Sequence, residues 1–223
     1  MQRCAAAAVV VALWTGGAHG QMASPDPGAD TATGYQAVES SSEKEWLFSP
    51  SIWGFVVPDD ADCIQLTVGA SYKHQYFEVR YNYEALETGS LWFGYIFETG
   101  GEFWLEFTPM LGGVFGDLGA LAPGYNVSLG YRKLDLYSEA EYVIDLEERE
   151  ENFLYSWSEL AFSPTDQFRF GFVVQRTRAY ESDLEIERGI LAGCLVKRWE
   201  ITGYLFNLGW EDPTLVLSFA TEF

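Results

Sequence analysis

Residues 214–223 read TLVLSFATEF, and the pattern of this segment gives the first indication of the fold. Leu215, Leu217, Phe219, Thr221 and Phe223 occupy every second position of it. Successive side chains of a β-strand point to opposite faces, so this alternation predicts a strand with one mainly apolar face. The chain is therefore expected to end on a β-strand.

Segments of the same texture fill the sequence from Trp46 onward. Each alternates apolar with polar positions and is followed by a cluster of turn-forming residues. The twelve predicted strands are 46–57, 63–73, 76–86, 90–98, 102–114, 124–132, 134–145, 152–162, 167–178, 185–196, 199–209 and 214–223. Their lengths suit tilted membrane strands of ~9–11 residues. The sequence therefore predicts an all-β, closed antiparallel transmembrane β-barrel of about twelve strands in up-and-down order, with ten or fourteen strands also compatible.

Segment 76–86 shows that alternation alone does not distinguish a membrane barrel from a soluble β-sandwich. One face carries Phe77, Val79, Tyr81 and Tyr83, and the other carries Glu78, Arg80, Asn82 and Glu84. A soluble sandwich would expose the charged face to water, whereas a membrane barrel would turn that face to its lumen. This segment fits both architectures.

The connections between the predicted strands alternate in character. The odd-numbered ones are acidic or longer: PDDAD, ETG, FGDLGALAPG, LEEREE, YESD and WEDP. The even-numbered ones are tight, and three of the five are basic: KHQ, TGG, RK, SPTD and KR. An outer-membrane barrel that starts in the periplasm has short periplasmic turns and longer outer loops in this order. The alternation therefore favours the membrane barrel.

The first 45 residues divide into two segments. Residues 1–20 are predicted to be a signal peptide, with Arg3, an apolar stretch at 4–14 and small residues before a cleavage point at Gln21. The apolar stretch is too short to span a bilayer as a helix. Residues 21–45 are rich in Pro, Gly, Ser and Asp and are predicted to be a flexible tail. The barrel domain is then 46–223.

The final strand resembles the C-terminal assembly signal of bacterial outer-membrane β-barrels. Phe219 and Phe223 are the residues that carry this resemblance. It implies localisation in the outer membrane of a Gram-negative cell and a barrel-assembly machinery as partner. The tract 155–177, YSWSELAFSPTDQFRFGFVVQRT, also resembles stretches of Gram-negative barrels and implies no activity. Together the resemblance covers residues 46–223.

The charge of the chain limits its partners. The net charge is −20, and loss of Arg3 with the signal peptide would lower it by one. Such a charge repels nucleic acid and favours cations. The acidic loop 147–151 lacks the spacing of a formed calcium site, so no metal and no cofactor are predicted.

Hydrolytic activity is not expected. The outer-membrane phospholipase and the lipid A deacylases resemble one another in a His–Ser pair on the barrel wall near the outer leaflet, where the histidine takes the serine proton. The only histidine after residue 20 is His74, which falls in a predicted periplasmic turn. The sequence therefore predicts a protein that is not an enzyme, and an outer-leaflet lipid-modifying enzyme ranks third behind the two functions given below.

The predicted lumen is acidic. Counting residues outward from the centre of each predicted turn sets Glu98 opposite Glu78, Glu102 beside Glu98, and Glu139 opposite Asn126. The residues expected to line the lumen are Glu78, Arg80, Glu98, Glu102, Glu106, Glu139, Glu141, Asp145 and Arg169. So many carboxylates need water, cations or protons if they are enclosed.

Two functions follow from such an interior. The leading one is a small passive channel for cationic or neutral solutes. The alternative is a closed structural or surface barrel, plugged by a charged hydrogen-bond network. Segment 152–162 does not decide between them, because either of its faces could meet lipid: one carries Tyr155 and Trp157, the other Leu154 and Leu160.

Cys63 and Cys194 are predicted to remain thiols. The predicted strands place them near opposite ends of the barrel, roughly 20 Å apart in depth at ~3.3 Å per residue. A disulfide requires Cα atoms within ~7 Å.

Arg176, Arg178 and Arg188 form a predicted lipopolysaccharide site. A turn centred near Ser182 sets Arg176 directly opposite Arg188, on the face expected to meet lipid. Like charges opposite each other destabilise a strand pair, and a phosphate held by both arginines would relieve this. Two alternatives stay open: acidic residues of the adjoining loop could neutralise the arginines, or a slipped register could turn them inward.

Overall fold

The computed structural model describes residues 46–56, 62–147, 152–179, 185–209 and 213–223. Their regular structure consists of β-strands. The strands are β1 (Leu47–Val56), β2 (Cys63–Tyr72), β3 (Gln75–Tyr81), β4 (Thr88–Tyr95), β5 (Phe97–Thr99), β6 (Phe103–Gly116), β7 (Ala120–Tyr131), β8 (Leu134–Asp145), β9 (Phe153–Thr165), β10 (Phe168–Ala179), β11 (Glu185–Val196), β12 (Trp199–Phe206) and β13 (Leu215–Thr221). The predicted all-β fold is confirmed.

The strands form a closed antiparallel barrel. Neighbours in sequence pair with one another, and β1 pairs with β13 to join the two ends of the sheet. Both β4 and β5 pair with β6, so they are two parts of one interrupted strand. Counted in this way, the barrel has twelve strands. Pro109 lies on β6 between the two pairings, and its lack of an N–H explains the interruption. The twelve-stranded meander is thus confirmed.

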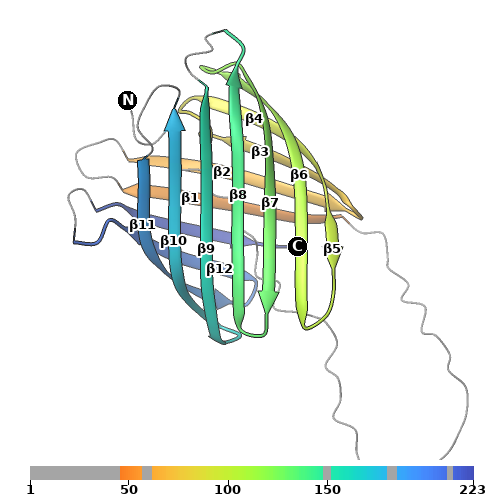
Figure 1. Cartoon of the computed structure of the whole chain (residues 1–223), viewed down its shortest axis with the longest axis vertical. Helices are drawn as coiled ribbons and strands as arrows, with labels where there is room; N and C mark the ends of the chain where they lie inside the picture. Colours follow the sequence, from red (N-terminus) through yellow and green to blue (C-terminus); the bar gives the residue numbers. More distant parts are fainter. Residues whose placement is uncertain (1–45, 57–61, 148–151, 180–184, 210–212) are drawn as a thin grey trace, which may run out of the picture.

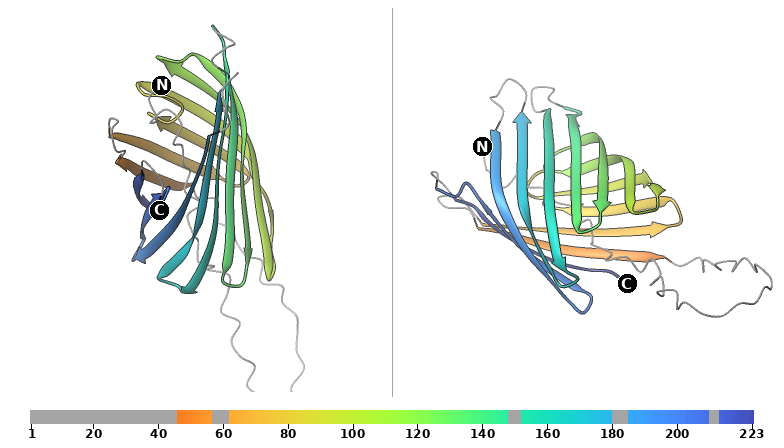
Figure 2. Two further views of the ribbon diagram at one scale, coloured as in Figure 1. Left: turned by 60° about the vertical axis from the view of Figure 1, so that its left-hand side comes forward. Right: turned by 60° about the horizontal axis from the view of Figure 1, so that its bottom comes forward.

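Strands on opposite sides of the barrel run in crossing directions. In Figure 1, β8, β9 and β10 run along the front, while β1, β2 and β3 pass obliquely behind them. Figure 2 gives the same arrangement from two further sides. The chain end takes part in closure, because the Phe48 and Phe223 backbones exchange hydrogen bonds of 2.8 and 3.0 Å.

Two predicted boundaries differ most from the structure. The segment expected as strand 76–86 stops at Tyr81, and residues 82–87 fold into a short loop. Asn82 and Glu87 have positive φ there, and the Asn82 side chain accepts a hydrogen bond from the Glu87 N–H at 2.8 Å. Part of the FGDLGALAPG connection was expected as an outer loop, but β7 begins at Ala120 and pairs with both neighbours.

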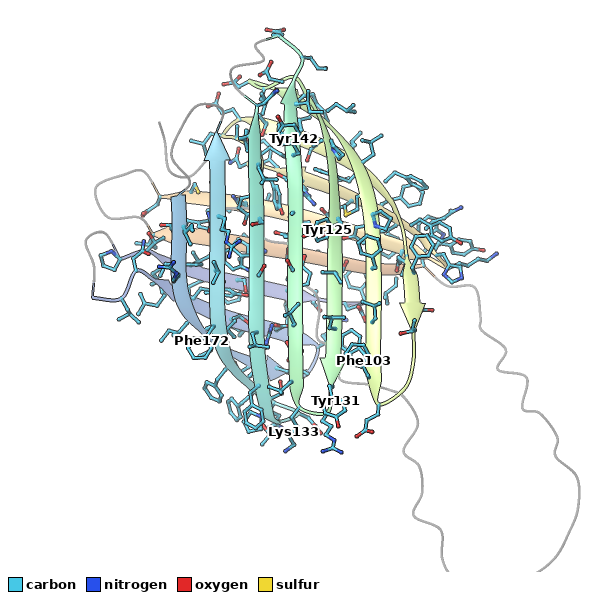
Figure 3. The ribbon with its side chains drawn as sticks, viewed as in Figure 1. Phe103, Tyr125, Tyr131, Lys133, Tyr142 and Phe172 are labelled. Atoms are coloured by element: carbon cyan, nitrogen blue, oxygen red, sulfur yellow. The ribbon has the colours of Figure 1, made fainter. Side chains whose placement is uncertain are left out.

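The outside of the barrel is apolar. Large exposed hydrophobic side chains include Ile64, Leu91, Phe115, Leu160, Phe172 and Leu217. Figure 3 places Tyr142 towards one rim and Tyr131 with Lys133 at the other, as expected of aromatic residues at two membrane interfaces. Within the described part of the chain, no helix is long and apolar enough to cross a membrane.

Candidate functional site

The interior of the barrel is the candidate site, and its first component is the Arg80 cluster. This cluster consists of Arg80, Glu78, Glu84, Glu139 and Glu141. Arg80 donates from Nε to Glu78 and from Nη1 to Glu141 at 2.8 Å, and Glu84 lies 3.6 Å from Nη1. Because β3 and β8 are not neighbours in the sheet, the Arg80–Glu141 bond ties two separate parts of the wall together.

Aromatic side chains enclose the Arg80 cluster. The guanidinium carbon lies 3.9 Å from the ring centre of Tyr83 and 4.2 Å from that of Trp92, within range of cation–π attraction. Tyr83 and Tyr137 donate their hydroxyls to Glu139 at 3.0 and 2.8 Å. The charges are therefore held by hydrogen bonds and rings rather than by bulk water.

The second component is the Arg169 cluster, whose members come from β8, β9, β10 and β12. Arg169 on β10 donates to Glu159 at 2.9 Å, to Glu200 at 3.1 Å and to Asp135 at 3.2 Å. Three carboxylates on one guanidinium leave an excess of negative charge, as in the Arg80 cluster.

An aromatic cluster fills the barrel at the level of Trp53 and Trp157. The centroid of the Trp157 ring lies 6.2 Å from Trp53, 5.2 Å from Tyr204 and 5.3 Å from Phe206. Trp53 comes from β1 and Trp157 from β9, on well-separated parts of the wall. Both tryptophans are 0% exposed, so neither ring is accessible to solvent in the described structure.

Negative charge dominates the buried interior. Among the described residues, seven buried carboxylates face two buried guanidiniums. The carboxylates are those of Glu78, Glu84, Glu139, Glu141, Asp145, Glu159 and Glu200. Glu84 Oε2 and Glu141 Oε1 are buried without a hydrogen-bond partner. A cavity of about 10 Å³ beside Arg80, Glu139 and Glu141 is the size of one water molecule.

The structure separates the predicted lumen residues into three groups. Buried inside the barrel are Glu78, Arg80, Glu139, Glu141, Asp145 and Arg169. Glu98 and Glu106 are exposed and lie directly opposite each other on β5 and β6. Phe97 and Phe107 are exposed on one face of these strands, and the two glutamates occupy the alternate positions, on the other face. Glu102 lies in the exposed β5–β6 turn, where it accepts a 2.8 Å bond from Arg132.

Two of the predicted pairings are wrong and one is confirmed. Glu78 lies opposite Trp92, because the chain turns in the loop at 82–87, earlier than the predicted strand 76–86 allows. Glu98 lies opposite Glu106, because the β5–β6 pairing is centred on Glu102, which therefore lies in the turn and not beside Glu98. Glu139 does lie opposite Asn126, because the tight turn at residues 132–133 fixes that register.

The structure assigns the two faces of β9. Tyr155, Trp157 and Glu159 are buried inside, whereas Leu154 and Leu160 are exposed. Trp157 pairs with Glu139 across the strands, so an inward Glu139 requires an inward Trp157. This neighbour rule could have identified Glu159 from the sequence. Trp53 and Tyr204, which meet Trp157, had no comparable local signal.

His74 lies in the β2–β3 turn, as predicted, and its ring stacks on Tyr95 with centroids 5.6 Å apart. Neither Cys63 nor Cys194 forms a disulfide, which confirms that prediction.

The Arg176 register differs from the predicted one. Arg188 lies opposite Val174, and Arg176 lies opposite Ile186, a shift of two residues. An even shift preserves the facing, so both arginines remain on the exposed outer side with Phe172. The side chain of Arg178 lies outside the described part.

Similarity to known proteins is found at the level of structure. No protein-family model matches the sequence, and no curated protein matches it. The KdgM porin is similar with a TM-score of 0.57 and 11% identity, over 78% of this chain and 99% of that chain; a second structure of it, in complex with disordered oligogalacturonate, gives the same values. The NanC porin has a TM-score of 0.56 and 9% identity, over 77% of this chain and 98% of that chain. The chain therefore has the barrel fold of outer-membrane porins.

Proposed function

We propose that this protein is a narrow outer-membrane channel for small cationic or neutral solutes, closed at the aromatic cluster in its present conformation. The observation that carries this proposal is the excess of inward carboxylates in a porin-like barrel with an apolar exterior. Carboxylates that line a pore select cations by charge.

The proposed path is lined by exposed and by buried acidic residues. Glu98 and Glu106 are exposed, whereas most carboxylates of the Arg80 and Arg169 clusters are buried. Enclosed carboxylates in excess of arginines need a compensating positive charge. A cation that enters past Glu98 and Glu106 would supply it, whereas an anion would be repelled.

A second candidate function is a permanently closed structural barrel. The observation that favours it is the aromatic cluster itself, with Trp53 and Trp157 fully buried, together with the Arg80–Glu141 ion pair, which joins separate parts of the wall. The two candidates differ in whether this cluster can move aside.

Conductance of the refolded protein in planar bilayers distinguishes them. The channel proposal expects brief, small openings in the wild type and a severalfold larger conductance in the double variant Trp157→Ala/Tyr204→Ala, because two rings leave the constriction. Trp199→Ala is the matched control, since Trp199 is exposed on β12 and should leave conductance unchanged. Folded protein that stays silent in both the wild type and the double variant would establish the closed barrel.

Cation preference is tested at the exposed end of the path. Glu98→Gln/Glu106→Gln should reduce the potassium-to-chloride permeability ratio severalfold, because the opposed carboxylates are lost. Glu102→Gln removes an exposed carboxylate in the adjoining turn and should leave the ratio close to wild type. Equal ratios in all three proteins would contradict a cation path past Glu98 and Glu106.

A further inference from the structure

The outer surface of the barrel carries a conspicuous pair of charges. Among the strand side chains that the structure describes, the outward positions hold apolar or uncharged residues, except at Arg176 on β10 and Arg188 on β11. Both side chains are exposed. No described acidic residue shares that surface, so these two guanidiniums are the described charges on the face expected to meet lipid.

The two arginines lie close enough to hold one ligand. Arg188 is directly opposite Val174, two residues before Arg176, so the arginines are diagonal neighbours across the β10–β11 pair. Such neighbours are about 7–8 Å apart at the backbone, within the reach of two long side chains. The diagonal also reduces the repulsion that directly opposed like charges would suffer.

Both arginines lie at the same end of the barrel. Arg176 is eight residues beyond Phe168, or about 26 Å along β10 at ~3.3 Å per residue. Arg188 is the fourth residue of β11, just after the β10–β11 connection. This end is opposite the one that carries the short turn with Lys133 (Figure 3), and in the proposed orientation it faces the outer leaflet.

Neither guanidinium has an ion-pair partner among the described residues, in contrast to Arg80 and Arg169 inside the barrel. A cation beside hydrocarbon requires a counter-charge. Arginine binds phosphate through two parallel N–H···O bonds, and two arginines on one phosphate match the charge of a phosphate monoester.

Apolar surface continues directly from the arginine pair. Phe172 is 67% exposed and lies opposite the exposed Ile190, one step further along the same face. Figure 3 shows Phe172 pointing away from the barrel. A ligand with a phosphate at the rim and hydrocarbon chains below it would contact both surfaces.

We propose that Arg176 and Arg188 bind the phosphate of a phosphorylated glycolipid of the outer leaflet, with an acyl chain packed along Phe172 and Ile190. The chemistry is that of lipopolysaccharide. This site is separate from the proposed channel and rests only on the placement of the barrel in the outer membrane.

The test compares the wild type with Arg176→Gln/Arg188→Gln in phosphatidylethanolamine vesicles, with and without bisphosphorylated lipid A. The measured quantity is the midpoint of thermal unfolding. We expect lipid A to raise the midpoint of the wild type by several degrees and to leave that of the double variant unchanged. Arg176→Lys/Arg188→Lys should respond partially, because lysine keeps the charge but loses the paired donors.

Three controls test whether the rise in the unfolding midpoint depends on the lipid phosphate and on the arginine pair. Arg132→Gln removes an exposed arginine from a turn at the other rim and should respond like the wild type. Enzymatically dephosphorylated lipid A and free inorganic phosphate should both fail to stabilise the wild type, which separates a lipid phosphate from the acyl chains alone and from a free anion. Equal stabilisation by dephosphorylated lipid A, or an undiminished response of the Arg176→Gln/Arg188→Gln variant, would overturn the proposal. Bilayer conductance of that variant should equal wild type, so this result is independent of the channel proposal.

Discussion

Arg80 and Arg169 each compensate several carboxylates inside the barrel. Arg169 alone contacts Asp135, Glu159 and Glu200. Burial makes such a group costly to dismantle, because removal of the single cation leaves its partners without a counter-charge. The exposed Arg132–Glu102 pair has the same chemistry but is screened by water.

Arg169→Gln should therefore destabilise the protein by roughly 3–5 kcal/mol, the cost of leaving buried charges unpaired. Equilibrium urea unfolding in lipid vesicles measures this value. Arg132→Gln is the matched control and should cost less than about 1 kcal/mol. Equal losses in the two variants would mean that the Arg169 cluster carries no special share of stability.

The cysteines give a second expectation at this scale. Cys63 is buried inside the barrel, and Cys194 is partly exposed. Mass spectrometry of the folded protein under non-reducing conditions should find both as thiols, without a Cys63–Cys194 crosslink. A membrane-permeant maleimide should modify Cys194 before Cys63, because Cys194 lies on the outer face with Ile190, whereas burial inside the barrel limits access to Cys63. Detection of the crosslink would contradict the strand register.

At the scale of the strand, β6 depends on the absence of a side chain at Gly112. A Cβ atom at Gly112 would overlap the ring of Trp92 on the neighbouring β4. That ring covers Arg80 and donates its N–H to Glu84 at 3.1 Å. At the next residue, Gly113, an added Cβ atom would meet no other atom within 4 Å.

Gly112→Ala should accordingly destabilise the barrel by about 1–3 kcal/mol, the usual cost of overpacking a filled interior. Gly113→Ala is the control on the same strand and should be close to neutral. Urea unfolding in vesicles measures both, and tryptophan fluorescence should report displacement of Trp92 only in the first variant. Indistinguishable stabilities would place Trp92 elsewhere than over Gly112.

At the scale of the whole molecule, the apolar exterior and the porin-like fold lead to one expected location. The protein should be recovered with outer-membrane fractions of a Gram-negative cell, and its N-terminus should begin near Gln21. Fractionation followed by N-terminal sequencing tests both points; residues 1–45 lie outside the described part of the chain. Recovery as a soluble periplasmic monomer would contradict the membrane assignment.

Most strands and most of their faces are predictable from the sequence. Alternation is a local property of the chain, so segments such as 134–145 and 185–196 coincide with β8 and β11. A tight turn carries register over a short distance, which is why Glu139 was correctly matched with Asn126. The alternation pattern does not show where the irregular loop at 82–87 begins or ends. The register of β4 against β3 therefore could not be predicted from the sequence.

The contacts that fill the barrel become visible with the tertiary structure. Trp53 meets Trp157, and Arg80 meets Glu141, although each pair comes from strands far apart in the sequence and around the wall. These contacts depend on how the closed sheet tilts and staggers its strands, which is a property of all twelve together. Alternation states that a side chain points inward, but the geometry of closure determines which inward side chain it meets.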